Sequence, residues 1–227
     1  MSYVSVVVPI YNESECIAPF VSRIAKELSG LDYEIIIAED GSDDAPGVIR
    51  GIGAKSCRVL HSDIRLGRGA ALTRAIKDAK SDIVLYMDAD LASEPGKTKR
   101  LIEGIENGAA VSTGSRLISG SNIRRGFTRS FMSRGFNLLV RFLLGSRIFD
   151  HQCGFKGFRR SAVLPLLKGV KATHWFWDTE LLVRAQWARL KVDEFPIEWK
   201  EGKGTKVRLF KDTLAMASGV IRLAIFR

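Results

Sequence analysis

The sequence contains few of the residues that build metal clusters and disulfide frameworks. It has three cysteines and three histidines among 227 residues. Cys16, Cys57 and Cys153 lie far apart and form no Cys-x-x-Cys pair, and the histidines show no ligand spacing. This scarcity argues against a zinc site or a disulfide framework, and it favours a reducing compartment such as the cytoplasm.

Long apolar runs are also missing. A membrane-spanning helix needs about 20 apolar residues, and the two most apolar stretches, residues 136–144 and 214–226, are broken by Arg141 and Arg222. The first residues already follow a strand pattern, so we expect no signal peptide. We therefore expect a cytoplasmic protein that is peripherally membrane-associated, meeting a membrane only with its surface.

Acidic residues are too few to balance the basic ones. The chain has 35 Lys and Arg against 25 Asp and Glu, which gives a net charge of +10 and an isoelectric point near 9.7. Such a surplus implies anionic partners: nucleic acid, acidic lipid or phosphorylated substrates. A nucleic-acid-binding surface would show aromatic residues interleaved with Lys and Arg, or a known binding module. Neither is evident, so we expect no nucleic-acid partner.

The order of apolar patterns predicts an α/β fold. Short apolar runs alternate with helix-length segments, which is typical of a Rossmann-like, doubly wound, mostly parallel sheet with helices on both faces. We expect strands at residues 4–9, 34–39, 58–61, 83–87 and 109–113, and helices at 15–28, after Asp44, at 69–80 and after Pro95. The second half predicts helices at 128–144 and 179–190, strands at 155–158 and 194–199, and an amphipathic C-terminal segment. With no linker or repeat, residues 1–227 form one predicted domain.

The tripeptide Asp88-Ala89-Asp90 directly follows the apolar run 83–87. Two carboxylates one residue apart, where a strand leaves the sheet, can both reach one divalent cation beside a bound diphosphate. Acidic pairs are also common in solvated turns, so the motif gains its weight from its neighbours.

Other nucleotide-binding motifs are incomplete or absent. Gly67-Arg68-Gly69-Ala70 opens a predicted helix but lacks the third glycine of a dinucleotide fingerprint, and there is no Walker phosphate loop. The sequence therefore favours neither a dehydrogenase nor a P-loop NTPase.

Polar motifs also follow the first two predicted strands: Pro9-Ile10-Tyr11-Asn12-Glu13 and Glu39-Asp40-Gly41-Ser42. An acidic residue at such a strand end suits a ribose hydroxyl or a base N–H, and a glycine permits close approach of the backbone. Capped turns would give the same pattern, so each motif taken alone leaves both interpretations open.

Further motifs follow in order: Gly114-Ser115-Arg116, residues 150–156, residues 175–180 and Gly204-Thr205-Lys206. The whole series resembles the family 2 glycosyltransferases with the GT-A fold, and among them the polyprenyl-phosphate sugar synthases that make dolichyl-phosphate mannose or glucose. Residues 150–156 look closer to the glucose type. The resemblance implies inverting, metal-dependent transfer of a hexose from a nucleotide-sugar donor, with a UDP-hexose favoured, to dolichyl or polyprenyl phosphate. A GDP-mannose donor or a non-lipid glycan acceptor is the alternative.

The resemblance also implies roles for individual residues. Asp88 and Asp90 would hold Mg²⁺ or Mn²⁺ on the donor diphosphate, and they would form the catalytic set together with Arg116, Arg129 and Asp178. The donor site would comprise Pro9, Tyr11, Glu13, Asp40, Arg68 and Lys206. The acceptor site would comprise Arg116, Arg129, Ser133, Asp150, Gln152 and Glu180. The donor half would be about residues 1–115 and the acceptor half about 116–227. Some relatives carry a glutamine after the acidic pair, where this chain has Leu91-Ala92-Ser93, so a third protein ligand stays open.

A phosphate acceptor changes what such a site must supply. With a second pKa of about 6, a phosphomonoester is largely dianionic at neutral pH and attacks without a strong general base. It needs cations for positioning, which bidentate arginines provide. Arg129, Ser133 and Asn137 share one helix stripe by i, i+4 spacing. A solvated basic face for the arginines, and a helix cap for Asp178, remain the alternatives.

Two segments offer surfaces for a long lipid. Residues 131–144 and 209–227 both combine apolar side chains with Lys or Arg, as helices lying in a membrane interface do. Packing on the core, or a dimer contact made by the C-terminal segment, explains the pattern equally well, so oligomerisation stays possible. A non-catalytic membrane-docked subunit is disfavoured because the acidic motifs are intact.

Overall fold

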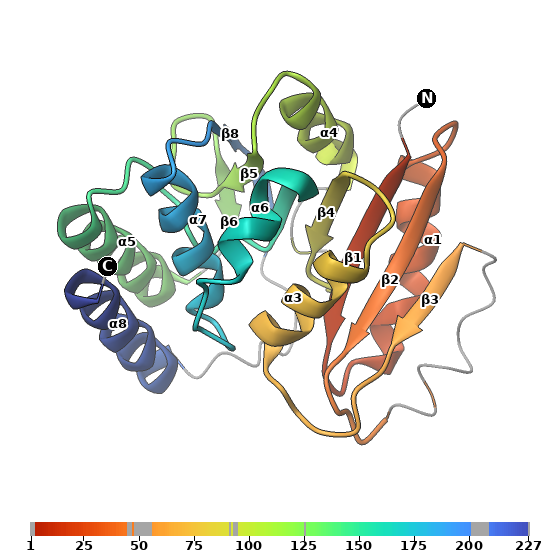
Figure 1. The fold of residues 1–227 in the computed structure, drawn as a ribbon, viewed down its shortest axis with the longest axis horizontal. Coiled ribbons are helices and arrows are strands. Elements are labelled where there is room, and N and C mark those ends of the chain that lie inside the picture. The colour runs from red at the N-terminus through yellow and green to blue at the C-terminus, as the bar shows by residue number, and fades with distance from the viewer. Residues whose placement is uncertain are drawn as a thin grey trace.

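The computed structural model describes residues 3–44, 47, 56–90, 92, 95–124, 126–200 and 209–226. Its centre is a seven-stranded sheet in the order β3-β2-β1-β4-β7-β5-β8 (Figure 1). The strands are β1 (Val4–Ile10), β2 (Tyr33–Glu39), β3 (Cys57–Leu60), β4 (Ile83–Met87), β5 (Val111–Ser115), β7 (Phe155–Arg159) and β8 (Val192–Pro196). The pairings are parallel except the two made by β7, which runs antiparallel between β4 and β5. The predicted mostly parallel α/β sheet is confirmed.

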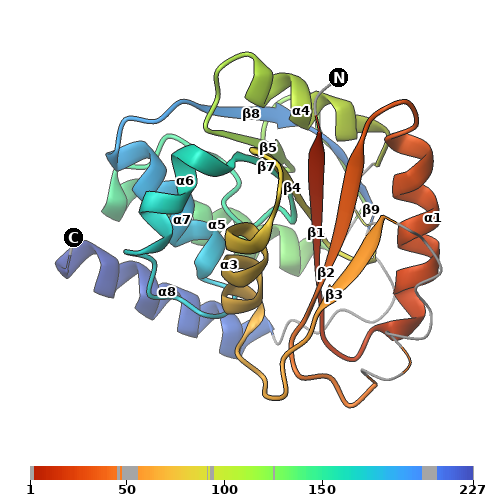
Figure 2. The same cartoon turned by 45° about the vertical axis from the view of Figure 1, so that its right-hand side comes forward.

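Helices cover both faces of this sheet (Figure 2). On one face lie α1 (Ile17–Glu27) and α4 (Thr98–Glu106), each preceded by a short 3-10 turn, η1 (Ser14–Cys16) and η2 (Pro95–Lys97). On the other face lie α3 (Arg68–Asp78), α6 (Arg160–Leu167) and α7 (Trp177–Trp187).

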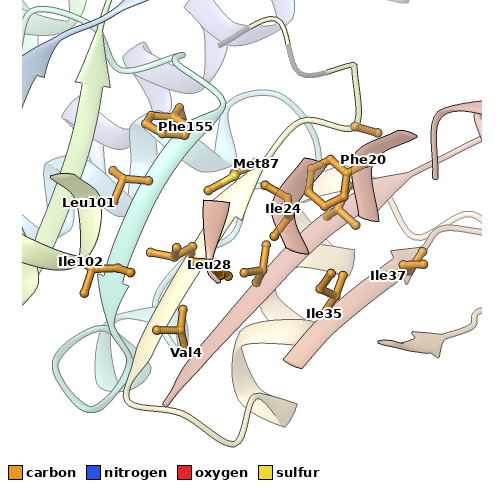
Figure 3. Packing of buried hydrophobic residues seen from close by; sticks show 14 of the residues in the cluster. Val4, Phe20, Ile24, Leu28, Ile35, Ile37, Met87, Leu101, Ile102 and Phe155 are labelled. Atoms are coloured by element: carbon orange, nitrogen blue, oxygen red, sulfur yellow. The ribbon is translucent and has the colours of Figure 1, made fainter. Parts of the chain in front are cut away.

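The central strand β1 shows how the sequence supports two layers. All seven of its residues are buried, as expected for a parallel strand covered on both faces. Because side chains alternate along a strand, Val4 belongs to the hydrophobic cluster that includes Phe20 and Ile24 of α1 (Figure 3), whereas Val7 belongs to the cluster that includes Leu72 of α3. The apolar run that predicted a buried strand therefore serves two separate cores.

Two further helices, α5 (Phe127–Leu144) and α8 (Leu209–Ile225), lie side by side at the edge of the molecule away from β3 (Figures 1 and 2). Their inner faces share a third hydrophobic cluster that includes Val140 of α5, Val220 of α8 and Val183 of α7. Within the described residues, no helix is both long enough and apolar enough to span a bilayer.

The structure corrects the prediction in the second half of the chain. The predicted strand at 194–199 is two strands: β8 completes the main sheet, and β9 (Glu198–Lys200) pairs with β6 (Asn122–Arg124) in a separate two-stranded sheet. Helix α6 was not predicted because it is short and carries Pro165, a residue that usually breaks helices. The helix expected after Asp44 falls largely outside the described residues.

Candidate active site

The carboxyl ends of β1, β2 and β4 open on one edge of the sheet, and β7 begins there because it runs in the opposite direction. Asp88, the first residue after β4, donates its backbone N–H to the carbonyl oxygen of Gly154 at 3.1 Å. A Cβ on Gly154 would lie 1.8 Å from Oδ2 of Asp88. Only glycine therefore leaves room for this carboxylate, so the entry to β7 shapes the position of Asp88.

Asp88 is the last member of a row of four side chains with alternating charge, here named the charge array: Lys156, Asp178, Arg68 and Asp88. Nζ of Lys156 donates to Oδ1 of Asp178 at 2.8 Å, and Nη1 of Arg68 donates to Oδ2 of Asp178 at 2.8 Å. Nη2 of Arg68 donates to Oδ1 of Asp88 at 2.7 Å. The Lys156 and Asp178 side chains are only 1% and 2% exposed, so each charge in the array depends on its neighbour.

Arg68 reaches this row because α3 begins at a sharp turn. Gly67 has a φ of +98°, which favours glycine, and the carbonyl oxygen of Thr173 accepts the N–H groups of Gly69 and Ala70 at 2.7 and 3.1 Å. These two N–H groups in the first turn of α3 are thus hydrogen-bonded within the protein. Asp178 lies in the first turn of α7, and both of its oxygens bind cations; the helix-cap alternative for Asp178 is not what the structure shows.

The two carboxylates that follow β4 are suitable ligands for a hard divalent cation. Asp88 has 42% of its side-chain surface exposed, while burial of the carboxyl among neighbouring atoms raises its pKa and the charge of Arg68 opposes that rise. Asp90 is exposed, and its Oδ1 accepts the N–H of Ala92 at 3.0 Å. Across the described residues, no three His, Cys, Asp or Glu side chains come together as metal ligands. Two carboxylates completed by donor phosphates and water are what Mg²⁺ or Mn²⁺ prefers.

The predicted donor residues line the ends of β1 and β2. Pro9 is buried within β1, and the guanidinium carbon of Arg65 lies 3.9 Å from the centre of the Tyr11 ring. Asp40 is buried and accepts the backbone N–H groups of Leu66 and Gly67 at 2.7 and 3.0 Å. Asp40 therefore secures the loop before α3, and its contact with a nucleotide stays a prediction.

Arg68 is surrounded by negative charge. Burial tends to lower the pKa of its guanidinium, but Asp88, Asp178 and Glu13 outweigh burial and hold that pKa above its ordinary value. Glu13, which directly precedes η1, thus acts on the charge array from the end of β1. The array and the predicted donor residues share one electrostatic environment.

On the predicted acceptor side, Arg116 is held by Asp150. Nε and Nη2 of Arg116 donate to the two oxygens of Asp150 at 2.7 and 2.9 Å, and the backbone N–H of Arg116 adds a third bond at 2.9 Å. Asp150 is fully buried, and the Arg116 charge holds its pKa at about 2 against the opposing effect of burial. We therefore assign Asp150 to positioning Arg116 rather than to touching an acceptor.

Two other predicted acceptor residues also have internal partners. Gln152 donates to Oγ1 of Thr179 at 2.6 Å. Glu180 is buried, and its oxygens bind Arg184 at 2.8 Å and the N–H of Ala172 at 2.8 Å. Glu180 therefore ties α7 to the preceding loop, and its predicted role in orienting the acceptor stays a prediction.

Arg129 and Ser133 are partly exposed on α5, as the predicted stripe requires. The third member of the stripe, Asn137, is buried, and its Oδ1 accepts from both the backbone N–H and Nδ1 of His151. Asn137 therefore joins α5 to the loop before β7. Lys206, predicted to lie over the donor diphosphate, is outside the described residues.

His151 is buried as a neutral ring. With Nδ1 donating to Asn137, Nε2 accepts from the hydroxyl of Ser146 at 2.7 Å, and that hydroxyl already accepts from Gln186 and from the N–H of Ile148. A second ring proton has no acceptor here. Burial is the main reason why the pKa of His151 falls to about 3.

This histidine predicts a pH dependence of stability. The unfolded state binds the proton below its pKa of about 6.5 and the folded state does not, so stability is full above pH 6.5 and is lost as pH falls toward 3. Between pH 7 and 5.5 the free energy of unfolding should drop by roughly 1 kcal/mol, measured by urea titration. The drop should largely vanish in His151→Gln, whatever that variant's overall stability. An unchanged drop in this variant would rule out His151 as its source.

Sequence reasoning gave no role to Lys156, although it is central to the charge array. Its signal was a lysine inside the apolar strand β7, where a cation is not tolerated without a partner. The partner, Asp178, lies 22 residues further along, and no spacing rule connects the two.

Comparison with known proteins places this site in a family. The family model for "Glycosyl transferase family 2" matches residues 5–166. Glycosyltransferase AglD of Haloferax volcanii is 43% identical over 96% of this chain, which spans 36% of that relative. The dolichyl-phosphate beta-glucosyltransferases of Saccharomyces cerevisiae and Homo sapiens are 31% and 30% identical over 98% and 96% of this chain, which spans 75% and 73% of them.

The fold is shared with solved structures. Glucosyl-3-phosphoglycerate synthase from Mycobacterium tuberculosis, in a complex with Mn²⁺, UDP and glucosyl-3-phosphoglycerate, superposes with a TM-score of 0.70 at 20% identity, over 97% of this chain and 77% of that one. The architecture is therefore that of a GT-A glycosyltransferase, as expected. The matches of sequence and fold agree: the chain belongs to glycosyl transferase family 2.

Proposed function

We propose that this chain transfers a hexose from a nucleotide-diphosphate sugar, with UDP-glucose favoured, to dolichyl or another polyprenyl phosphate, with inversion at the anomeric carbon. The observation that carries the proposal is the pair Asp88 and Asp90 at the carboxyl end of β4, next to a row of fixed charges. Relatives at about a third identity that are named dolichyl-phosphate beta-glucosyltransferases support the donor sugar and the acceptor.

In this proposal Asp88 and Asp90 hold Mg²⁺ or Mn²⁺. When bound, the metal neutralises charge on the departing nucleoside diphosphate. Pro9, Tyr11, Glu13 and Asp40 would shape the nucleotide end of the site, with Lys206 over the diphosphate. A phosphate acceptor is already charged at neutral pH, so it attacks directly and a single displacement inverts the sugar. No covalent nucleophile is required.

In this proposal the two halves of the chain bind different substrates. We assign about residues 1–115 to the donor and about 116–227 to the acceptor, within one GT-A domain. Arg129 and Ser133 on α5 would meet the acceptor phosphate, and Arg116, fixed by Asp150, would present its charge from the end of β5. Cations at these positions favour a phosphate acceptor over a neutral glycan hydroxyl, which would need a base.

Replacing Arg129 by alanine should harm use of the lipid phosphate and spare the donor. The loss of a charge-assisted contact is expected to lower transfer efficiency by about 2 kcal/mol, roughly thirtyfold, while the dissociation constant of the nucleotide holds. Arg23→Ala, which removes an exposed arginine from α1, is the matched control. Normal transfer efficiency in Arg129→Ala would remove this residue from the site.

The outer faces of α5 and α8 suit a membrane surface. On α5, the side chains of Phe127, Phe131, Leu138 and Phe142 follow each other at helical spacing and are 85%, 70%, 66% and 84% exposed. On α8, the exposed large apolar residues among the side chains that the structure describes are Leu214, Ile221 and Ile225. An apolar stripe flanked by arginines is typical of helices that lie in the lipid interface. The alternative that these side chains pack on the core does not apply, because the opposite faces of both helices do so.

The double substitution Phe131→Ser with Phe142→Ser should weaken binding to vesicles of phosphatidylcholine and phosphatidylserine by at least about tenfold. Each aromatic side chain would lose roughly 1.5 kcal/mol or more of burial in the bilayer. Cosedimentation measures the effect, and Ile64→Ser, which removes an exposed apolar side chain from another region, is the control. Unchanged vesicle binding, or a dimer that the double variant dissolves, would assign the stripe to a protein contact instead.

The proposed reaction is tested with the purified protein, Mn²⁺ and dolichyl phosphate. Labelled UDP-glucose should yield a lipid-linked β-glucosyl phosphate. Transfer from GDP-mannose alone would overturn the donor assignment. A retained anomeric configuration would overturn the mechanism, and transfer only to a free glycan would overturn the acceptor.

A further inference from the structure

Arg68 binds one of the two carboxylate oxygens of Asp88, a proposed metal ligand. Its Nη2 lies 2.7 Å from Oδ1 of Asp88, the same oxygen that the hydroxyl of Tyr86 approaches at 3.2 Å. The guanidinium carbon lies 5.0 Å from the centre of the Tyr86 ring and 4.8 Å from that of Trp175. The guanidinium thus makes cation–π contacts with both aromatic rings, and its charge neutralises that of Asp88.

This contact opposes the binding of a divalent cation to Asp88. A metal ion lies about 2.1 Å from a carboxylate oxygen, so a cation on either oxygen of Asp88 would be within about 7 Å of Nη2. This separation is shorter than the Debye length at physiological salt, and the Arg68 side chain is only 16% exposed to water. The repulsion between the two positive charges is therefore weakly screened. Metal and Arg68 therefore compete for Asp88.

The rest of the charge array gives Arg68 a fixed pivot. Its Nη1 stays bound to Asp178, whose other oxygen is held by buried Lys156. If Nη2 leaves Asp88, the guanidinium remains at the edge of the site with free N–H groups. A nucleoside diphosphate brings negative charge to that position, and arginine binds phosphate oxygens well.

We propose that Arg68 is an exchanging cation. It binds Asp88 when the site is empty, and it moves to the donor diphosphate when the metal takes Asp88. This inference rests on the proposed function for the identity of the donor. Its consequence is that Arg68 opposes binding of the metal alone and favours binding of nucleotide with metal, so the two ligands become coupled through one side chain.

Removal of the charge should therefore move two affinities in opposite directions. In Arg68→Gln, Mn²⁺ without nucleotide should bind about tenfold tighter, and UDP at saturating Mn²⁺ about tenfold weaker, which is the usual size of coupling between two sites. Electron paramagnetic resonance measures the free Mn²⁺, and calorimetry measures the UDP. Arg100→Gln, which removes an arginine of α4 that is paired with Asp193 of β8, should change neither affinity.

Two further variants keep the test decisive. Arg68→Met retains an unbranched apolar stem, and the same two changes in affinity are expected for it if Arg68→Gln does not fold. Asp88→Asn should abolish the Mn²⁺ site in both backgrounds, and tightening that survives it would overturn the exchange. Mn²⁺ affinity that is unchanged or weaker without Arg68 would also overturn it. If UDP fails to bind the wild type with Mn²⁺, the proposed function fails, whereas the measurement with Mn²⁺ alone still decides the competition at Asp88.

Discussion

Replacing Asp88 or Asp90 by asparagine is expected to abolish sugar transfer while leaving the fold intact. Each change keeps the shape of the side chain but removes one anionic oxygen donor from the proposed metal site. Loss of charge stabilisation on a leaving diphosphate should lower turnover by about a thousandfold or more. The measurement is initial rate at saturating Mn²⁺, with the thermal unfolding midpoint as the check on folding.

Asp63→Asn is the matched control, because this carboxylate is 99% exposed and lies outside the charge array. It should transfer sugar at the wild-type rate. Wild-type turnover in either Asp88→Asn or Asp90→Asn, or full activity of the native protein in EDTA, would contradict metal-bound donor chemistry.

The second large effect concerns stability. Asp178→Asn removes the carboxylate between Lys156 and Arg68, and it leaves the Lys156 ammonium buried without its ionic partner. Breaking a buried pair from one side costs about 3–5 kcal/mol, so the urea midpoint should fall markedly. Asp193→Asn breaks a more exposed pair with Arg100 and should cost no more than about 1 kcal/mol.

A double variant measures the interaction between Lys156 and Asp178 separately from the effect of each single substitution. Lys156→Met together with Asp178→Asn removes both buried charges, so it should be more stable than Asp178→Asn alone. If the losses of the two single variants simply add, Lys156 and Asp178 do not stabilise each other, and the charge array is not a connected unit.

The sequence predicted those parts of the fold whose signal is local. The strand at Ile83–Met87 was predicted with its observed bounds, because five apolar residues between polar ones fit a strand buried on both faces. Asp88 and Asp90 followed from their position after it. Antiparallel β7 was not foreseeable, since strand direction within a sheet leaves no mark on the alternation of apolar residues.

The partners within the site depend on long-range contacts. Arg68 and Asp178 are 110 residues apart, so no sequence spacing could pair them. Glu180 was named from its motif, and its contacts with Arg184 and Ala172 became visible only with the fold. Asp150 was named from its motif, and its complete burial became visible only with the fold.

The binding of UDP to the protein in the presence of Mn²⁺ tests the central claim most directly. A ligand that binds only the native state raises the unfolding midpoint, so UDP with Mn²⁺ should raise it, and UDP in EDTA should raise it little. Asp88→Asn should lose the metal-dependent part. Equal stabilisation by UDP in EDTA, or a full metal-dependent shift in Asp88→Asn, would contradict a donor site built on the carboxylates at the end of β4.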